Sequence, residues 1–125
     1  MTNSYITAAS TPKDQAYGFV FTDCKLTAKD NTVDKVFLGR PWRPYAQTVF
    51  INTDIGSHII PEGWNEWIDT RFPDKDKTAY YAEYASKGQS AKNVSKRVSW
   101  SHQLKKSDSK KYDRDLVLNG WDPNK

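Results

Sequence analysis

Few side chains of this 125-residue chain could act as a nucleophile or as a metal ligand. It has one cysteine, Cys24, and two histidines, His58 and His102. A single cysteine excludes an internal disulfide framework and a multi-cysteine zinc site, and no Gly-x-Ser-x-Gly elbow indicates a serine hydrolase. We expect Cys24 to be a small buried side chain and neither histidine to be catalytic. Three carboxylates could be imagined as an acid–base pair, but their spacing does not support one: Asp23, Asp54 and Glu83.

The positive charge of the chain is concentrated near its end. The formal net charge is +4, and residues 92–114 contain eight Lys or Arg but only two Asp. Such a stretch can contact a polyanion by releasing counterions, although no nucleic-acid motif accompanies it. We therefore expect a solvated face, no nucleic acid as partner, and a basic interaction module as the last-ranked function. No run approaches the roughly 18 apolar residues of a membrane helix, and Met1–Ser10 lack the features of a signal peptide.

The elements that would position a site are short strands separated by turns. Alternating aromatic and β-branched residues predict strands, and lysine-rich Gln103–Tyr112 is the one helix candidate. We expect the end of the chain to fold back, because an exposed Trp121 would be costly. The pattern fits an antiparallel sandwich or a parallel β-helix equally well. The expected strands are Tyr17–Leu26, Val36–Leu38, Thr48–Asn52, Lys77–Tyr84 and Arg97–Trp100.

Several blocks of residues stand out along the chain: Leu38-Gly39-Arg40-Pro41-Trp42, Thr48-Val49-Phe50, Pro61-Glu62-Gly63-Trp64, Tyr80-Tyr81-Ala82-Glu83-Tyr84 and Arg97-Val98-Ser99-Trp100. In order and spacing these blocks resemble the carboxy-terminal part of the pectin methylesterase (pectinesterase) family. Together the blocks cover nearly the whole chain. The lysine-rich end and the Trp-Ser-His-Gln-Leu segment at 100–104 resemble bacterial members more than plant ones.

The resemblance implies a fold and an activity. Members of this family are all-β proteins with a right-handed parallel β-helix, so we expect the later coils of such a helix and a short helical carboxy-terminal tail. They hydrolyse methyl esters of galacturonic acid units in pectin, releasing methanol. One Asp is the nucleophile, a second Asp is the general acid/base, glutamine side chains stabilise the oxyanion, and neither a metal nor an organic cofactor is needed.

Four residues map onto or near the family's site. The resemblance assigns Arg40 to the catalytic machinery, where a guanidinium fixes the nucleophilic carboxylate by paired hydrogen bonds and lowers its pKa. It assigns Trp42 and Trp64 to the substrate groove, where indole faces stack on sugar rings. Tyr45 is close enough to Trp42 to border the same groove, whereas Trp67 is expected to pack.

The resemblance also predicts what lies outside this chain, because the family's catalytic Asp pair is upstream of the matching blocks. We therefore expect residues 1–125 to be the carboxy-terminal segment of a single pectinesterase domain, inactive alone, with pectin as partner and no membrane contact. The parent protein would be secreted or periplasmic. A cut coil exposes strand edges and apolar interior, so we expect marginal stability or self-association through the amino-terminal end, which sedimentation would detect.

A second hypothesis is a non-catalytic β-solenoid fragment that binds acidic polysaccharide or is purely structural. The Arg40-Pro41-Trp42 block separates both hypotheses from a basic interaction module, which has no need of it. Methanol release from methylated pectin separates the first hypothesis from the second.

Overall fold

The chain forms three small parallel β-sheets that it visits in turn, as in a parallel β-helix. A computed structural model describes residues 3–123. On the first pass the chain forms β1 (Ser4–Ala9), β2 (Phe19–Thr22) and β3 (Lys25–Leu26). On the second pass it forms β4 (Val36–Pro41), β5 (Gln47–Ile51) and β6 (Asp54–Ile55), and each pairs in parallel with its counterpart from the first pass.

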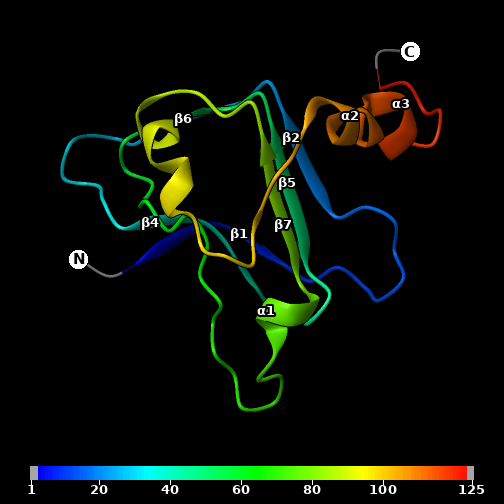
Figure 1. Cartoon of the computed structure of the whole chain (residues 1–125), viewed down its shortest axis with the longest axis horizontal. Helices are drawn as coiled ribbons and strands as arrows, with labels where there is room; N and C mark the ends of the chain where they lie inside the picture. Colours follow the sequence, from blue (N-terminus) through cyan, green and yellow to red (C-terminus); the bar gives the residue numbers. More distant parts are fainter. Residues whose placement is uncertain (1–2, 124–125) are drawn as a thin grey trace.

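Later passes extend the same sheets. Isolated parallel bridges join Ile59 to Val36 and Trp64 to Gly39. The strand β7 (Tyr80–Tyr84) pairs with β5, and β8 (His102–Gln103) pairs with β7. Figure 1 shows β2, β5 and β7 side by side along the molecule. Every strand pair within residues 3–123 is parallel, which excludes the antiparallel sandwich that the sequence pattern alone left open.

A repeated corner explains why these strands are short. Asp23, Asn52 and Ala85 follow directly after β2, β5 and β7, and all three have a positive φ, of 56°, 50° and 53°. Asn and Asp adopt this left-handed conformation more readily than most residues, and Asn52 Nδ2 donates to Asp23 Oδ1 at 2.6 Å. The single strand predicted over Tyr17–Leu26 is therefore wrong: Asp23 divides it into β2 and β3.

The core contains side chains that stack from one pass to the next, as Phe21 on Phe50, and side chains from another sheet that meet them in the interior, as Trp64 does. Phe21 stacks on Phe50 with ring centroids 4.7 Å apart, and Phe50 lies 5.9 Å from Trp64. Phe50 and Trp64 are essentially inaccessible to solvent. Burial of aromatic side chains that are aligned from pass to pass is the main stabilisation available to a solenoid.

A buried ion pair closes the later passes. Glu83 is fully buried in β7 and accepts hydrogen bonds from Arg97 Nε at 2.8 Å and Arg97 Nη2 at 3.2 Å. Arg97 Nη1 donates to the carbonyl of Pro61 at 3.1 Å. Gly63 makes room for this side chain, because a Cβ there would lie 2.5 Å from Arg97 Cδ and φ is +76°. Arg97–Trp100 thus forms a turn that anchors the core, and the strand predicted there is wrong.

Short helices lie between and after the later strands, and turns and irregular segments make up most of the remaining described chain. The helix α1 (Lys75–Thr78) precedes β7, and the 3₁₀ segment η1 (Gln89–Lys96) follows it. The helix predicted over Gln103–Tyr112 begins later than expected and consists of two short pieces, α2 (Lys106–Ser109) and η2 (Lys110–Tyr112). A further helix, α3 (Arg114–Val117), follows them. Figure 1 shows α2 and α3 at one end of the β2–β5–β7 sheet.

The carboxy-terminal helices are attached by aromatic and polar contacts. Tyr17 donates a hydrogen bond to the carbonyl of Lys111 at 2.6 Å, and its ring meets Tyr112 edge-on at 5.8 Å. Trp121 remains 64% exposed, so the expectation that it packs onto the body is wrong. Cys24 is only partly buried. Within residues 3–123, no helix has the length and apolar character required to cross a membrane.

Candidate active site

Arg40 lies near the end of β4 in a cage of aromatic rings. Its Cζ is 4.1 Å from the ring centroid of Tyr5 and 3.7 Å from that of Trp67. The register pairs Ala8 of β1 with Arg40, so the guanidinium comes from the β1–β4 sheet. Arg40 Nε is buried and has no hydrogen-bond partner within the described part of the chain. The two rings hold the Arg40 guanidinium in place without neutralising its charge. The guanidinium can therefore still bind an anionic group.

Trp67 connects Arg40 to the exposed Trp42. The rings of Trp42 and Trp67 meet edge-on with centroids 4.9 Å apart. Trp42 follows the last residue of β4 and is held by a hydrogen bond from its backbone N–H to Ala9 O at 2.9 Å. Its indole is 46% exposed and so is available to stack on a sugar ring.

Sequence reasoning placed Trp64 in the groove, and the structure places it in the core. Its side chain is 1% exposed and stacks on Tyr81 with centroids 4.3 Å apart. The parallel bridge to Gly39 fixes this inward direction, and Asn65 N–H continues the pairing to Gly39 O at 3.0 Å. Trp67, which was expected only to pack, is the indole beside Arg40. The backbone of Trp67 is held in position by a hydrogen bond from its backbone N–H to Asn65 Oδ1 at 2.7 Å, and its φ is 50°.

Tyr45 lies on the surface of the turn between β4 and β5. Its ring is 36% exposed and has Lys13 Nζ 5.5 Å from its centroid. Within residues 3–123, the ring that pairs with Trp42 is that of Trp67, not that of Tyr45. Its assignment to the groove stays a prediction.

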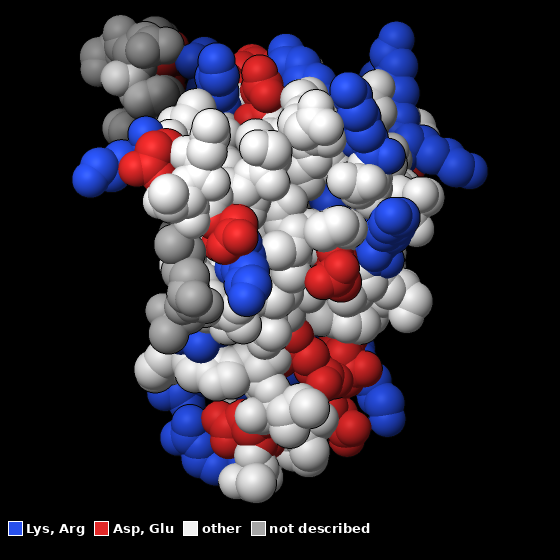
Figure 2. Space-filling model, turned by 90° about the vertical axis from the view of Figure 1, so that its left-hand side faces the viewer, with Lys and Arg blue, Asp and Glu red and all other residues white. Residues whose placement is uncertain are grey.

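Acidic side chains gather near the loop before α1. Hydrogen bonds from the side chain and from the backbone N–H of Arg71 lower the pKa of Asp69 to about 2. Desolvation, and then a hydrogen bond with Asp76, raises the pKa of Glu66. Figure 2 shows acidic side chains concentrated toward the lower end of one face, with basic ones over the upper part. Within residues 3–123, no group of three or more His, Cys, Asp or Glu side chains is arranged to hold a metal ion.

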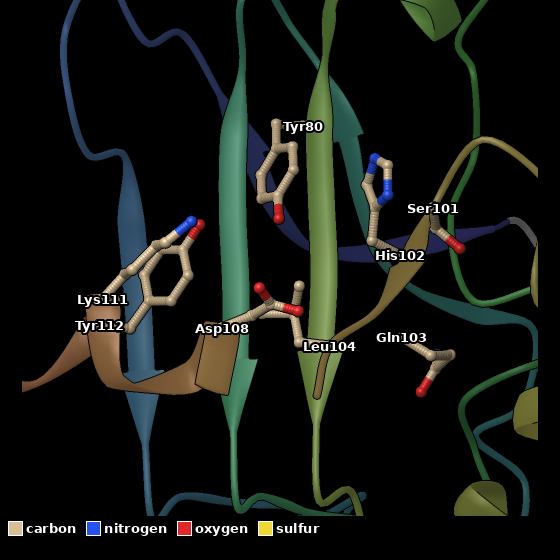
Figure 3. A pocket seen from close by; sticks show the side chains of 8 residues that line it. All are labelled: Tyr80, Ser101, His102, Gln103, Leu104, Asp108, Lys111 and Tyr112. Atoms are coloured by element: carbon tan, nitrogen blue, oxygen red, sulfur yellow. The ribbon is translucent and has the colours of Figure 1, made fainter. Parts of the chain in front are cut away.

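The other residues considered for chemistry lie away from Arg40 or are already engaged. Glu83 is committed to Arg97. His58 is buried, and desolvation lowers its pKa. His102 is exposed on β8 and stacks on Tyr80 at 4.7 Å in a hollow of about 560 Å³. Figure 3 shows this hollow between β7–β8 on one side and α2 with η2 on the other; α2 carries Asp108, and η2 carries Lys111 and Tyr112.

Comparison with known proteins identifies the family to which this arrangement belongs. The Pectinesterase family model matches residues 1–120. The chain belongs to the pectinesterase family. It is 41% identical over 103 residues to putative pectinesterase 11 of Arabidopsis thaliana, which covers 82% of this chain and 27% of that relative. It is 38% identical over 109 residues to a probable pectinesterase/pectinesterase inhibitor of Brassica napus, covering 82% of this chain and 18% of that relative.

Solved pectinesterase structures align over nearly the whole chain. A pectin methylesterase in complex with a hexasaccharide aligns with a TM-score of 0.77 and 29% identity, over 97% of this chain and 40% of that one. The pectin methylesterase from Erwinia chrysanthemi aligns with a TM-score of 0.76 and 30% identity, over 95% of this chain and 39% of that one. The pectin methylesterase from carrot aligns with a TM-score of 0.77 and 27% identity, over 93% of this chain and 38% of that one. This pectinesterase chain therefore spans well under half the length of these relatives.

The exchanged roles of the two loop tryptophans can be tested by stability. Trp64→Ala is expected to lower the free energy of unfolding by about 3–5 kcal/mol, because it empties a core site between Phe50 and Tyr81. Trp67→Ala is expected to cost clearly less, since the Trp67 side chain is only partly buried. Urea denaturation followed by circular dichroism measures both. Equal losses for the two variants would contradict this assignment.

Proposed function

We propose that this chain is the carboxy-terminal part of a pectin methylesterase and supplies the arginine and the aromatic groove of its active site. The observation that carries the proposal is the Arg40 guanidinium, held between Tyr5 and Trp67 beside the exposed Trp42, in a chain of the pectinesterase family. The solved complex of one such enzyme with a hexasaccharide supports a sugar polymer as the ligand.

In the proposed reaction Arg40 acts on a carboxylate that lies outside these 125 residues. An upstream Asp attacks the carbonyl of the methyl ester, and a second upstream Asp gives a proton to the departing methanol and then activates the water that releases the product. Arg40 would hold the nucleophilic Asp by paired, charge-assisted hydrogen bonds and keep it ionised. The proposed reaction uses no metal and no organic cofactor.

The aromatic side chains would bind the polymer. Trp42, Trp67 and Tyr45 present partly or largely exposed rings around Arg40 and along the loop that follows it. Stacking of indole on the apolar face of a sugar ring would set the position of each galacturonate unit. Trp67 replaces Trp64 in this assignment because only Trp67 reaches the surface.

The proposal also covers the parent domain, its location and the self-association of this chain. Residues 1–125 would be the later coils of one right-handed β-helix domain, and the parent protein would be secreted or periplasmic. The free edges of β1 and β2 within the described residues, and the 54% exposed Phe19, support self-association at that end of the solenoid.

The alternative function is a non-catalytic solenoid that binds acidic polysaccharide. The two cations that lie over the Trp67 ring, Arg40 and Lys75, also fit this alternative.

Methanol release from highly methylated pectin tests the proposal. A chain extended upstream through the catalytic Asp pair is expected to release methanol, and the 125-residue chain alone is expected to release none. Activity in the short chain would place the catalytic acids among Asp23, Asp54 and Glu83 and overturn the proposed division of the site. Inactivity of both, with sugar binding retained, would favour the non-catalytic alternative.

A further inference from the structure

The hollow beside β8 has an aromatic floor on a different sheet from the candidate active site. It has a volume of about 560 Å³ and lies on the β2–β5–β7–β8 sheet, whereas Arg40 comes from the β1–β4 sheet. Tyr80 precedes the fully buried Tyr81 in β7, so its ring faces the outer side of the sheet. The exposed ring of His102 lies nearly parallel to that of Tyr80, at an angle of 20°. An exposed ring supported in this way can stack against the apolar face of a ligand.

Polar groups of α2 and η2 form the opposite wall of the hollow. Figure 3 shows the tips of Lys111 and Tyr112 turned toward Tyr80, with Asp108 on the same side. Within residues 3–123, the ammonium of Lys111 forms no salt bridge. Desolvation, and then a hydrogen bond with Tyr80, raises the pKa of Tyr112. The phenol of Tyr112 therefore stays protonated at neutral pH, and it can donate a hydrogen bond.

Contacts outside the hollow hold its two walls in place. The hydroxyl of Tyr17 donates to the carbonyl of Lys111 at 2.6 Å, and the Tyr17 ring packs edge-on against Tyr112. On the other side the backbone N–H of Leu104 donates to the carbonyl of Glu83 at 2.8 Å, which continues the pairing of β8 with β7. A hollow whose walls are fixed before a ligand arrives loses less conformational freedom when it binds one.

We propose that this hollow is a second carbohydrate site, which binds one uronic acid unit of an acidic oligosaccharide. The apolar face of the sugar would stack on His102, its carboxylate would pair with Lys111, and its hydroxyls would bond to Asp108 and Tyr112. A uronic acid carries these three kinds of group on one ring, and the hollow offers a partner for each. The site goes beyond the proposed function, and only the choice of galacturonate as its uronic acid rests on that function.

Amide NMR spectra of the 125-residue chain test the proposal, with unesterified digalacturonate as the probe. Saturable shifts are expected at β8 and η2. Lys111→Met is expected to weaken this binding about tenfold, the loss of one charge-assisted contact. His102→Ala is expected to weaken it roughly two- to tenfold through the lost stacking. The neutral disaccharide of galactose is expected to bind the unaltered chain about as weakly as digalacturonate binds Lys111→Met.

Lys110→Met is the matched control, because Lys110 is the neighbouring lysine of η2 and lies outside the lining of the hollow. It is expected to retain full affinity. Lys110 and Lys111 are both exposed, so neither substitution removes core packing. Equal weakening by the two substitutions would show a general attraction to the basic helices and overturn the site. Equal affinity for the neutral disaccharide would overturn the role of Lys111 in the same way.

The location of the shifts separates this site from the proposed groove. Shifts confined to residues around Arg40 and Trp42 would overturn the second site and leave the groove standing. Shifts at β8 and η2 that persist in Trp42→Ala would support the second site whether or not the groove binds sugar. The absence of shifts at either place would overturn both.

Discussion

Arg97→Met is expected to lower the free energy of unfolding by about 3–5 kcal/mol, the cost of leaving a buried charge without its partner. Glu83 is completely buried and receives two hydrogen bonds from Arg97. The remaining donors, Ser86 Oγ at 2.8 Å and Gln103 Nε2 at 2.9 Å, are neutral and would not replace the lost charge. Chemical denaturation followed by circular dichroism measures the change.

The size of this effect comes from the location of the pair as much as from its charge. Arg97 also donates to Ser90 Oγ at 3.3 Å, and Ser90 Oγ donates to Ile59 O at 3.1 Å. One guanidinium thus joins segments that belong to different passes of the solenoid. The double variant Glu83→Gln with Arg97→Met is expected to recover much of the loss, because no buried charge is left unpaired.

Arg71→Ala is the control for the buried pair. The side chain of Arg71 also donates two hydrogen bonds to a carboxylate, that of Asp69. The Arg71 side chain is 70% exposed, whereas that of Asp69 is 15% exposed. Exposed ion pairs add little to stability because water and salt screen them. Asp69 also keeps the hydrogen bond from the backbone N–H of residue 71 in this variant. The free energy of unfolding should therefore fall by much less than in Arg97→Met. A loss for Arg71→Ala as large as that for Arg97→Met would contradict the argument from burial.

Most strands were predictable because their side chains alternate in type. The errors of this prediction are confined to single corners and turns. Val36–Leu38 and Thr48–Asn52 lie close to β4 and β5. The corner at Asp23 was missed because a left-handed residue does not interrupt the alternation of residue types. The parallel pairing came from the resemblance, since alternation is the same in parallel and antiparallel strands that are half-buried.

The candidate site was predictable only where the chain is regular. Arg40 and Trp42 flank the last residue of β4, so the strand fixes their directions. Trp64 and Trp67 occupy an irregular loop, where no period of residue types shows which indole points inward. The decisive feature is the pairing of Trp64 with Gly39, a contact between distant segments. The burial of Lys75, which is 1% exposed, was not predictable either, because lysine is seldom buried and the stretch around it is strongly polar.

The other large effect is expected at Arg40. In a chain extended upstream through the catalytic Asp pair, Arg40→Ala is expected to lower kcat by a factor on the order of 10² or more, as misplacement of a reacting group by about 1 Å does. Arg40→Lys is expected to recover only part of the lost kcat. A lysine ammonium keeps the positive charge but lacks the planar guanidinium that binds a carboxylate by two hydrogen bonds. Initial rates of methanol release measure all three proteins.

A pH profile separates a catalytic role of Arg40 from a structural one. The guanidinium stabilises the ionised nucleophile, so its removal raises the pKa of that Asp. Activity requires the ionised form, and the acid limb of kcat/KM should therefore move to higher pH in Arg40→Ala. Arg43→Ala is the control, since Arg43 is exposed and three residues away. If Arg40→Ala only lowered stability, the acid limb of kcat/KM would stay in place while the amount of folded protein fell. Either this result or equal rates for Arg40→Ala and Arg43→Ala would remove Arg40 from the proposed site.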